Sequence, residues 1–311
     1  GDASFREFYR LRKNNKTSII VSAKKEKFKN LIVYAVVNKI LNTNKVNAPK
    51  LLSNHYNNDM IEISDLGEKS FYDFVISKKN KLNDYKSLVK LIIKVQKIKV
   101  KKSYKLGKFK FKFLKYDLKN LHKESDLFFD WYLKYFLKKK KNSKVKKLLK
   151  AELNKVYKKL KFSNNTFVHR DFHASNIMIK KKKLGLIDSQ DAILGNPLYD
   201  VVSLIDDVRI KLPNNLQNNL IHFYHKNSKL KKYGIENLKN DFDILSVQRN
   251  LKILGIFVRL SIRDGKNNYL KFLPYTWTLI ERRLRNPIFK NLNILINKNL
   301  PIKKLRQLNK I

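Results

Sequence analysis

The feature that most constrains the fold of this chain is the segment 168–188, VHRDFHASNIMIKKKKLGLID, in which short apolar strands alternate with polar residues. Asp171 and Asn176 stand five positions apart on a loop between two of these strands, and Asp188 ends the next strand. Apolar runs this short and this close together predict a hairpin. The segment therefore predicts two carboxylates and one amide on the loops that join short strands.

Residues of these types in this order can perform phosphoryl transfer. One carboxylate must accept the proton of the attacking hydroxyl, and another, with an amide oxygen, must hold Mg²⁺ against the nucleotide phosphates. Each residue alone has a commoner explanation, since Asp and Asn in turns usually bond to the backbone and a lone His169 beside a strand is usually a core residue. The combination H-R-D-x-x-x-x-N, an apolar strand and then Asp188 favours the catalytic interpretation.

The first 66 residues predict a small β-rich lobe. Residues 5–13 and 18–23 are expected to form two strands joined by a turn at Asn14-Asn15, and residues 59–63 a further strand. Apolar residues at helical spacing predict a helix over 25–41.

Residues 67–311 predict a larger helical lobe. Amphipathic spacing predicts helices over 70–79 and 84–98, two long helices within 116–161, and helices from residue 199 to the C-terminus. Phe alternates with Lys over 109–113, a strand-like pattern whose assignment stays open. The expected fold class is α+β, with an N-lobe at 1–66 and a C-lobe at 67–311.

The charge of the chain invites a nucleic-acid interpretation. It has 70 Lys and Arg against 25 Asp and Glu, a net charge of +45, which would raise its affinity for any polyanion. The excess is mostly lysine, scattered along the whole length together with abundant Asn and Ile, as AT-rich codons would produce. Proteins that recognise base sequence use arginine more than lysine, so we expect no specific nucleic-acid partner.

Other features of the composition exclude whole classes of protein. The absence of cysteine excludes a disulfide scaffold, a Cys-ligated zinc site and thiol catalysis, and it suits a reducing cytoplasm. No uncharged apolar run approaches the roughly 20 residues of a membrane helix, and no export signal is recognisable. We therefore expect a soluble cytoplasmic globular protein with no membrane partner, present as a monomer.

The 168–188 segment resembles the catalytic and metal-binding motifs of the aminoglycoside/choline phosphotransferase family, which has the protein-kinase fold. Further segments are similar to the family's bacterial anomeric sugar kinases, which act on N-acetylmuramate and N-acetylglucosamine. They are GDASFREFYR at 1–10, DLG at 65–67, the segment 124–132 and QRNLKILGIF at 248–257. The resemblance spans nearly the whole chain and implies a bilobal kinase-like fold.

The resemblance also implies roles for individual residues. Asp171 would be the catalytic base, and Asn176 and Asp188 would bind Mg²⁺. Gln190 and Asp191 match the sugar-kinase group and are expected to contact sugar hydroxyls, although capping of the strand end explains them equally well.

The nucleotide site is implied in the same way. The loop over the ATP phosphates would comprise Gly1, Asp2, Ala3 and Ser4, with backbone N–H groups facing the anion. Glu62 and Ile63 would lie near the hinge that reads the adenine edge.

Two departures from the kinase pattern stand out. Protein kinases place a Lys after the apolar triplet of the third strand, whereas here Ser22 follows the triplet at 19–21 and Lys24 is the nearest candidate. This leaves the neutralisation of the α- and β-phosphates unassigned. Gly1 is not an initiator Met, so we expect the chain to begin inside a longer reading frame with an incomplete N-lobe.

Three functions are compatible with these residues. The favoured one is an ATP-dependent kinase, with Mg²⁺, for the anomeric hydroxyl of N-acetylmuramate or N-acetylglucosamine in cell-wall recycling. The second is a kinase for another small hydroxyl compound, such as an aminoglycoside, choline or other amino sugar. The third is a non-catalytic nucleotide- or nucleic-acid-binding protein, which would have no need of all three residues Asp171, Asn176 and Asp188.

Overall fold

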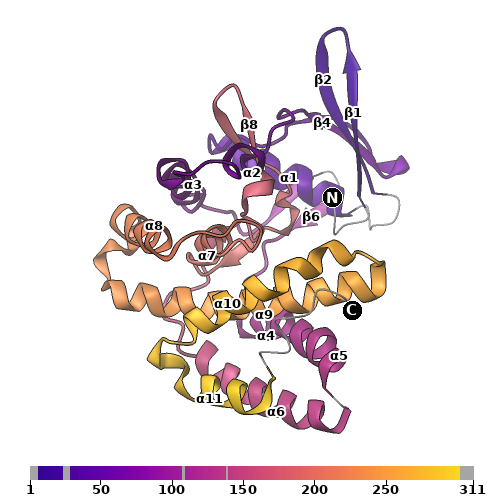
Figure 1. Cartoon of the computed structure of the whole chain (residues 1–311). Coiled ribbons are helices and arrows are strands. Elements are labelled where there is room, and N and C mark those ends of the chain that lie inside the picture. The colour runs from indigo at the N-terminus through magenta and orange to yellow at the C-terminus, as the bar shows by residue number, and fades with distance from the viewer. Residues whose placement is uncertain (1–5, 24–28, 107–108, 138, 302–311) are drawn as a thin grey trace. The chain divides into compact units, whose positions relative to one another are not determined.

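The computed structural model describes residues 6–23, 29–106, 109–137 and 139–301 and divides the chain into two compact units. The first unit comprises Gly1–Lys115 and Asn165–Leu194, and the second Tyr116–Asn164 and Gly195–Ile311 (Figure 1). The first unit thus joins the strand-rich N-terminal part to the 168–188 segment. The expected lobe boundary after residue 66 is a different division and stays a prediction.

A four-stranded antiparallel sheet forms the start of the first unit. Its strands are β1 (Glu7–Lys13), β2 (Lys16–Ser22), β3 (Leu51–His55) and β4 (Met60–Ser64), in the order β1-β2-β4-β3. Asn14 and Asn15 join β1 to β2 with φ angles of 48° and 58°. Two consecutive positive φ angles are the requirement of a type I′ turn, which asparagine tolerates, so the predicted hairpin is confirmed.

Helix α1 (Lys29–Thr43) packs on this sheet and builds its core. The predicted helix over 25–41 is confirmed within the described residues. The core consists of buried apolar side chains from β2, α1 and β4: Val21, Ala23, Leu31, Tyr34, Ile61 and Ile63. The alternating inward positions of two strands meet one face of the helix, as the periods of strand and helix require.

Short elements complete the first unit. They are α2 (Phe71–Val75), α3 (Leu82–Val95), β5 (Tyr104–Leu106), β6 (Phe109–Phe111), β7 (Thr166–Val168), β8 (Ile177–Lys180), β9 (Lys183–Leu186) and β10 (Ile193–Gly195). The structure assigns Phe109–Phe111, the first part of the stretch 109–113, to a strand, because β5 and β6 pair as an antiparallel hairpin. It also confirms the predicted hairpin at 177–187, formed by β8 and β9.

The second unit is helical, as predicted. Its helices are α4 (Leu118–Leu127), α5 (Lys134–Phe136), α6 (Lys139–Tyr157), α7 (Tyr199–Ile205), α8 (Asn214–Asn227), α9 (Ile235–Asp264), α10 (Leu273–Arg283) and α11 (Lys290–Asn299). The first of the two long helices expected within 116–161 is interrupted, since a π-helical turn at Phe128–Leu133 separates α4 from α5. The α+β fold class is confirmed.

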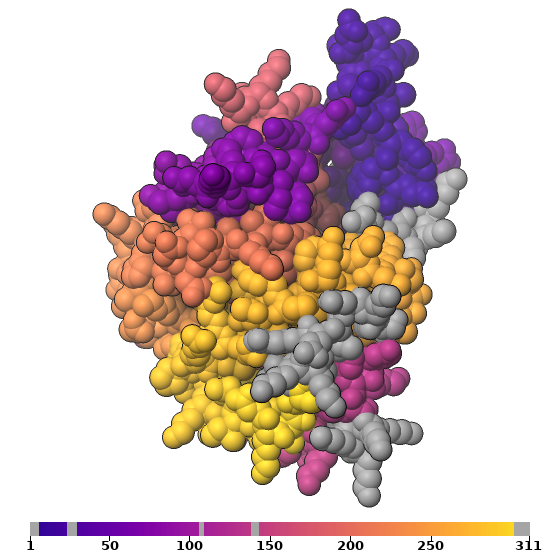
Figure 2. Space-filling view, viewed as in Figure 1, coloured from indigo at the N-terminus to yellow at the C-terminus, as the bar shows by residue number. Residues whose placement is uncertain are grey.

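Strand β1 of the β1–β2 hairpin is exposed to solvent. All seven residues of β1 are exposed, and Figure 2 shows this hairpin, in indigo, at the surface of its unit. Among the described helices, none combines the length and the apolar character that crossing a bilayer requires.

Candidate active site

The loop that follows β7 is tied to the strand end before Asp188 by two hydrogen bonds. His169 is fully buried, and its Nε2 lies 3.1 Å from the carbonyl oxygen of Ile187. A carbonyl oxygen only accepts, so this nitrogen carries the proton. The N–H of Ile187 donates in turn to the carbonyl of Asn176 at 3.0 Å. His169 is therefore a core residue, as is usual for a lone histidine beside a strand, and it sets the spacing between the Asp171 loop and Asp188.

Asn176 is oriented by the backbone of Asp171. Its Nδ2 donates to the carbonyl of Asp171 at 3.0 Å and lies 3.2 Å from Nε2 of His173. With its NH₂ group engaged in this way, the amide oxygen is the atom that Asn176 offers to a cation. The side chain of Asp171 is 44% exposed, and its Oδ1 lies 3.9 Å from Nε2 of His173. An accessible carboxylate is what a base acting on an incoming hydroxyl requires.

Asp188 stands in a strained conformation after β9. Its φ of 62° and ψ of 43° lie in the left-handed region, which costs a non-glycine residue on the order of 1–3 kcal/mol. One carboxylate oxygen, Oδ1, accepts hydrogen bonds from Nη2 of Arg6 at 3.2 Å and from Nε2 of Gln190 at 3.0 Å. The Arg6 side chain is only 7% exposed. A partly buried ion pair thus holds the predicted metal ligand, whose own side chain is 33% exposed.

Gln190 and Asp191 lie beside Asp188 in a 3-10 turn, Ser189–Asp191. Besides its bond to Asp188, Nε2 of Gln190 donates to Oδ2 of Asp191 at 3.2 Å. The other oxygen of Asp191 lies 3.5 Å from Nη1 of Arg170, and the Asp191 side chain is 58% exposed. The structure therefore brings both predicted substrate residues into one polar network with the predicted metal ligand.

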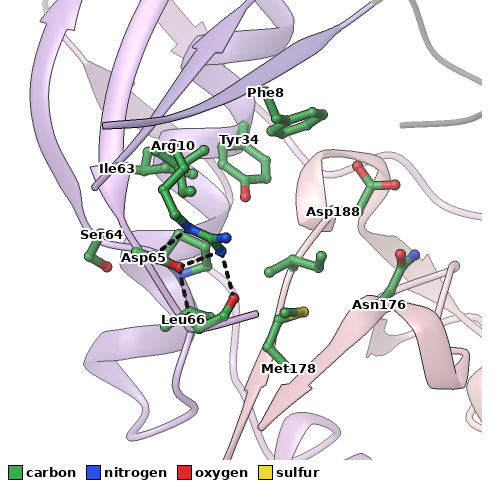
Figure 3. Close-up of a pocket in the computed structure, with 14 residues that line it drawn as sticks. Phe8, Arg10, Tyr34, Ile63, Ser64, Asp65, Leu66, Asn176, Met178 and Asp188 are labelled. Atoms are coloured by element: carbon green, nitrogen blue, oxygen red, sulfur yellow. Dashed lines mark hydrogen bonds and ion pairs between the residues drawn. The ribbon is translucent and has the colours of Figure 1, made fainter. Parts of the chain in front are cut away.

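A pocket of about 280 Å³ opens next to these residues within the first unit. Its walls come from the β1–β2 hairpin, α1, the segment before β3, the end of β4 with the segment after it, and the segment from Asn176 to Asp188. The lining residues are Phe8, Arg10, Ile19, Tyr34, Pro49, Ile63, Ser64, Asp65, Leu66, Gly67, Asn176, Met178, Ile187 and Asp188. Figure 3 shows Asn176 and Asp188 on one side of the pocket and Arg10 with Asp65 on the other. A mostly apolar cleft with polar groups at its ends is the usual form of a small-molecule site.

Arg10 and Asp65 close the second side of this pocket. Nε and Nη2 of Arg10 donate to the two carboxylate oxygens of Asp65 at 2.9 and 3.3 Å, and Nη2 also donates to the carbonyl of Gly67 at 3.0 Å (Figure 3). Burial acts to raise the pKa of Asp65, but hydrogen bonds from Arg10 and from the Gly67 N–H outweigh it and lower that pKa. Asp65 thus stays ionised and ties β1 to the chain that leaves β4.

The two predicted hinge residues have different environments. Ile63 lines the pocket, where β4 pairs with Ile19 of β2. Glu62 is not among the pocket-lining residues of the described chain, and its carboxylate accepts a hydrogen bond from Ser53 at 3.1 Å. The predicted phosphate-loop residues Gly1, Asp2, Ala3 and Ser4 lie outside the described residues, as does Lys24.

Sequence reasoning missed the part that β1 plays in the site. Arg6, Phe8 and Arg10 are spaced two apart, so they share one face of the strand and its extension. Phe8 and Arg10 line the pocket, and Arg6 reaches Asp188. The period-two spacing of two arginines around an aromatic residue was the available signal.

Similar proteins point to one chemistry. The profile of the Phosphotransferase enzyme family matches residues 2–234. An N-acetylmuramate/N-acetylglucosamine kinase from Pseudomonas aeruginosa is 28% identical over 290 residues, which are 91% of this chain and 82% of the relative. A protein of the same name from Neisseria meningitidis serogroup B is 25% identical over 277 residues, 88% of this chain and 80% of the relative.

Solved structures share the fold. An ADP-bound aminoglycoside phosphotransferase APH(2'')-Ib superposes with a TM-score of 0.59 at 13% identity, over 91% of this chain and 94% of that one. A choline/ethanolamine kinase family protein from Mesorhizobium loti also gives a TM-score of 0.59, at 12% identity, over 94% of this chain and 92% of that one. The kinase-like fold expected from the sequence is thereby confirmed.

Proposed function

Because this chain belongs to the Phosphotransferase enzyme family, we propose that it transfers the γ-phosphoryl group of ATP to the anomeric hydroxyl of N-acetylmuramate or N-acetylglucosamine. The observation that carries the reaction type is that Asn176 and Asp188 both line one side of a largely apolar pocket. The acceptor is supported by the two bacterial sugar kinases, which align with about nine tenths of this chain.

In this proposal the base is Asp171. Its exposed carboxylate accepts the proton of the anomeric hydroxyl as that oxygen forms its bond to the γ-phosphorus, and the bond from phosphorus to the bridging oxygen of ADP breaks. His173, 3.9 Å from this carboxylate, and the Asn176 bond to the Asp171 backbone hold the loop in place. The products are ADP and the sugar 1-phosphate.

The donor set of Asn176 and Asp188 fits Mg²⁺. One carboxylate and one amide oxygen are hard ligands, and Mg²⁺ usually takes only one or two carboxylates from the protein and completes its shell with phosphates and water. When bound, the ion supplies neutralising charge to the phosphate oxygens. The two side chains would hold the ion, and the hydrogen bonds from Arg6 and Gln190 orient the carboxylate of Asp188 for this task.

The rest of the pocket would hold the nucleoside. Ile19, Ile63 and Met178 offer apolar surface to the purine ring, and the loop Gly1, Asp2, Ala3 and Ser4 would cover the phosphates. Gln190 and Asp191 would take the sugar hydroxyls. Glu62 would contact the adenine edge through its backbone, because its carboxylate accepts a hydrogen bond from Ser53.

We place this reaction in the cytoplasm, where ATP is available, with a free sugar as its partner. The second candidate, a kinase for an aminoglycoside, choline or another amino sugar, is supported by the fold shared with such enzymes. A positively charged chain suits a neutral or anionic acceptor better than a cationic one.

A panel of acceptors incubated with Mg·ATP tests the proposal. N-acetylmuramate, N-acetylglucosamine, kanamycin and choline are compared by ADP release, and the product is analysed by phosphorus NMR. An anomeric phosphate couples to the single proton H1, whereas a C6 phosphate couples to two methylene protons. Transfer to C6, or only to kanamycin or choline, would contradict the proposed acceptor and leave the phosphotransferase chemistry intact.

A further inference from the structure

The described residues at the end of β2 do not include the cation that protein kinases place there. In protein kinases a Lys in this place contacts the α- and β-phosphates and pairs with a Glu of the neighbouring helix. Here Ser22 ends β2, and the described helix α1, KNLIVYAVVNKILNT, contains no carboxylate. Among the residues that the structure describes, neither partner of that ion pair therefore stands at the end of β2 or in α1.

Arg6 directly precedes β1, the strand that pairs with β2. The register of β1 and β2 pairs Glu7 with Ser22, so one step further places Arg6 opposite Ala23, on the face of the hairpin that Phe8 and Val21 share. Its side chain is 7% exposed, and its Nη2 lies 3.2 Å from Oδ1 of Asp188. A buried guanidinium requires an anionic partner, because an uncompensated buried charge is very costly.

Three other described cations near this site have partners of their own. Arg10 bonds to Asp65, to Glu68 and to the Gly67 carbonyl. Lys180 donates to the carbonyl of Asp65 at 2.8 Å, and Arg170 faces Asp191. Arg6 is the cation that the described chain places against the predicted metal ligand itself.

We infer that Arg6 binds the diphosphate of the nucleotide, the role that a third-strand lysine has in protein kinases. The inference rests on the proposed function. A guanidinium presents five N–H donors in a fixed fork, enough to keep its bond to Asp188 and also to hold two phosphate oxygens. Asp188 is the predicted Mg²⁺ ligand. The ion pair between Arg6 and Asp188 would therefore position both positive charges that face the phosphates, the guanidinium and the Mg²⁺ ion.

Measuring nucleotide affinity in the absence of metal and sugar tests whether Arg6 binds the diphosphate. The affinities of adenosine, AMP, ADP and ATP are measured by calorimetry for the parent chain and for Arg6→Met, in buffer containing a chelator. We expect ADP and ATP affinities to fall about 10- to 100-fold, as for loss of charged hydrogen bonds, and the adenosine affinity to change less than twofold. The matched control is Arg12→Met, on the same strand but with a side chain that is 73% exposed, which should leave all four affinities unchanged.

Two outcomes overturn the inference. An equal loss for adenosine and ADP would mean that Arg6 only maintains the shape of the pocket. A loss that appears only when Mg²⁺ is added would mean that Arg6 only positions Asp188. If Arg6→Met does not fold, Arg6→Gln decides, since it removes the charge but keeps a polar side chain: a several-fold loss for ADP with adenosine unchanged supports the role, and unchanged ADP affinity refutes it.

Failure of the proposed function gives a different result. If none of the sugars is phosphorylated while ADP affinity still depends on Arg6, the acceptor assignment is wrong and the role of Arg6 stands.

Discussion

Ser189 donates a hydrogen bond of 2.6 Å from its Oγ to Oδ1 of Asn38, and both side chains are buried. Ser189 follows the predicted metal ligand Asp188, and Asn38 lies in the middle of α1. The contact joins residues 151 positions apart in the sequence. It ties the helix of the N-terminal sheet to the turn that carries Asp188, Gln190 and Asp191.

We expect Ser189→Ala to lower the free energy of unfolding by about 1–3 kcal/mol, because it leaves a buried amide oxygen without its donor. Urea unfolding measures the change. In a double-mutant cycle, Ser189→Ala made in an Asn38→Ala background should cost clearly less than in the parent. Fully additive effects would show that this bond contributes nothing to stability.

Asp171→Asn should reduce turnover about 10²- to 10⁴-fold, because the amide cannot accept the proton of the sugar hydroxyl. Binding of Mg·ATP should stay within a few-fold of the parent, since the base acts on the acceptor and not on the nucleotide. Single-turnover kinetics and calorimetry measure the two effects. Asp130→Asn, at an exposed site in the second unit, is the matched control, and near-parental turnover in Asp171→Asn would exclude its role as base.

Asp188→Asn should behave in the opposite way and weaken the binding of Mg·ATP itself. The change removes the charged ligand of the ion while keeping the shape of the side chain. Titrations of ATP with and without Mg²⁺ check this: the benefit of added Mg²⁺ seen in the parent should be largely lost in the variant. An undiminished benefit would remove Asp188 from the metal site.

Gly255→Ala should be destabilising even though it lies within helix α9, where alanine is normally favoured by about 1 kcal/mol. A Cβ at this position would lie 2.2 Å from the backbone carbon of Leu127 in α4. Backbone cannot move aside as a side-chain end can, so α4 and α9 must separate, at a cost of about 1–3 kcal/mol or more.

Gly234→Ala is the control for this substitution. Its nearest neighbour would be Nδ2 of Asn237 at 3.6 Å, an ordinary contact, and its φ of −59° suits any residue. Urea unfolding should therefore show little change at Gly234 and a clear loss at Gly255. Equal effects of the two variants would contradict the close approach of α4 and α9.

Asp243 should make stability depend on pH. Burial raises the pKa of its carboxyl to about 6, and Arg283, whose Nη1 lies 3.6 Å away, only partly offsets this. Between about pH 4 and pH 6 the folded state binds a proton at Asp243 that the unfolded chain does not. The contribution of this group to the free energy of unfolding is therefore largest at low pH and falls as the pH rises through about 6.

Asp243→Asn removes this dependence because the amide does not titrate. The unfolding free energy of the variant minus that of the parent should rise by about 2 kcal/mol from pH 4.5 to pH 6.5, from about 1.4 kcal/mol per pH unit of unequal protonation. Chemical denaturation at several pH values measures the difference. A difference that is independent of pH would show that the buried carboxyl keeps its ordinary pKa.

Much of the local structure was predictable because it depends on neighbouring residues. The Asn14-Asn15 turn follows from residues that tolerate positive φ, and the strand and helix periods follow from apolar spacing. The 168–188 segment is local in the same sense, so the sequence predicts the hairpin that carries Asn176 and Asp188. The roles of Asp171, Asn176 and Asp188 in catalysis stay predictions until the variants are measured.

The sequence by itself determined the family, the α+β class and the polar residues of the 168–188 loop. Only the tertiary structure decided that Arg6 meets Asp188 across 182 positions, that Ile63 rather than the Glu62 side chain lines the pocket, and that Phe128–Leu133 forms a π-helical turn. These outcomes depend on which faces of distant elements are packed together. Packing depends on the summed burial of many side chains, so the residue spacing within one segment does not predict it.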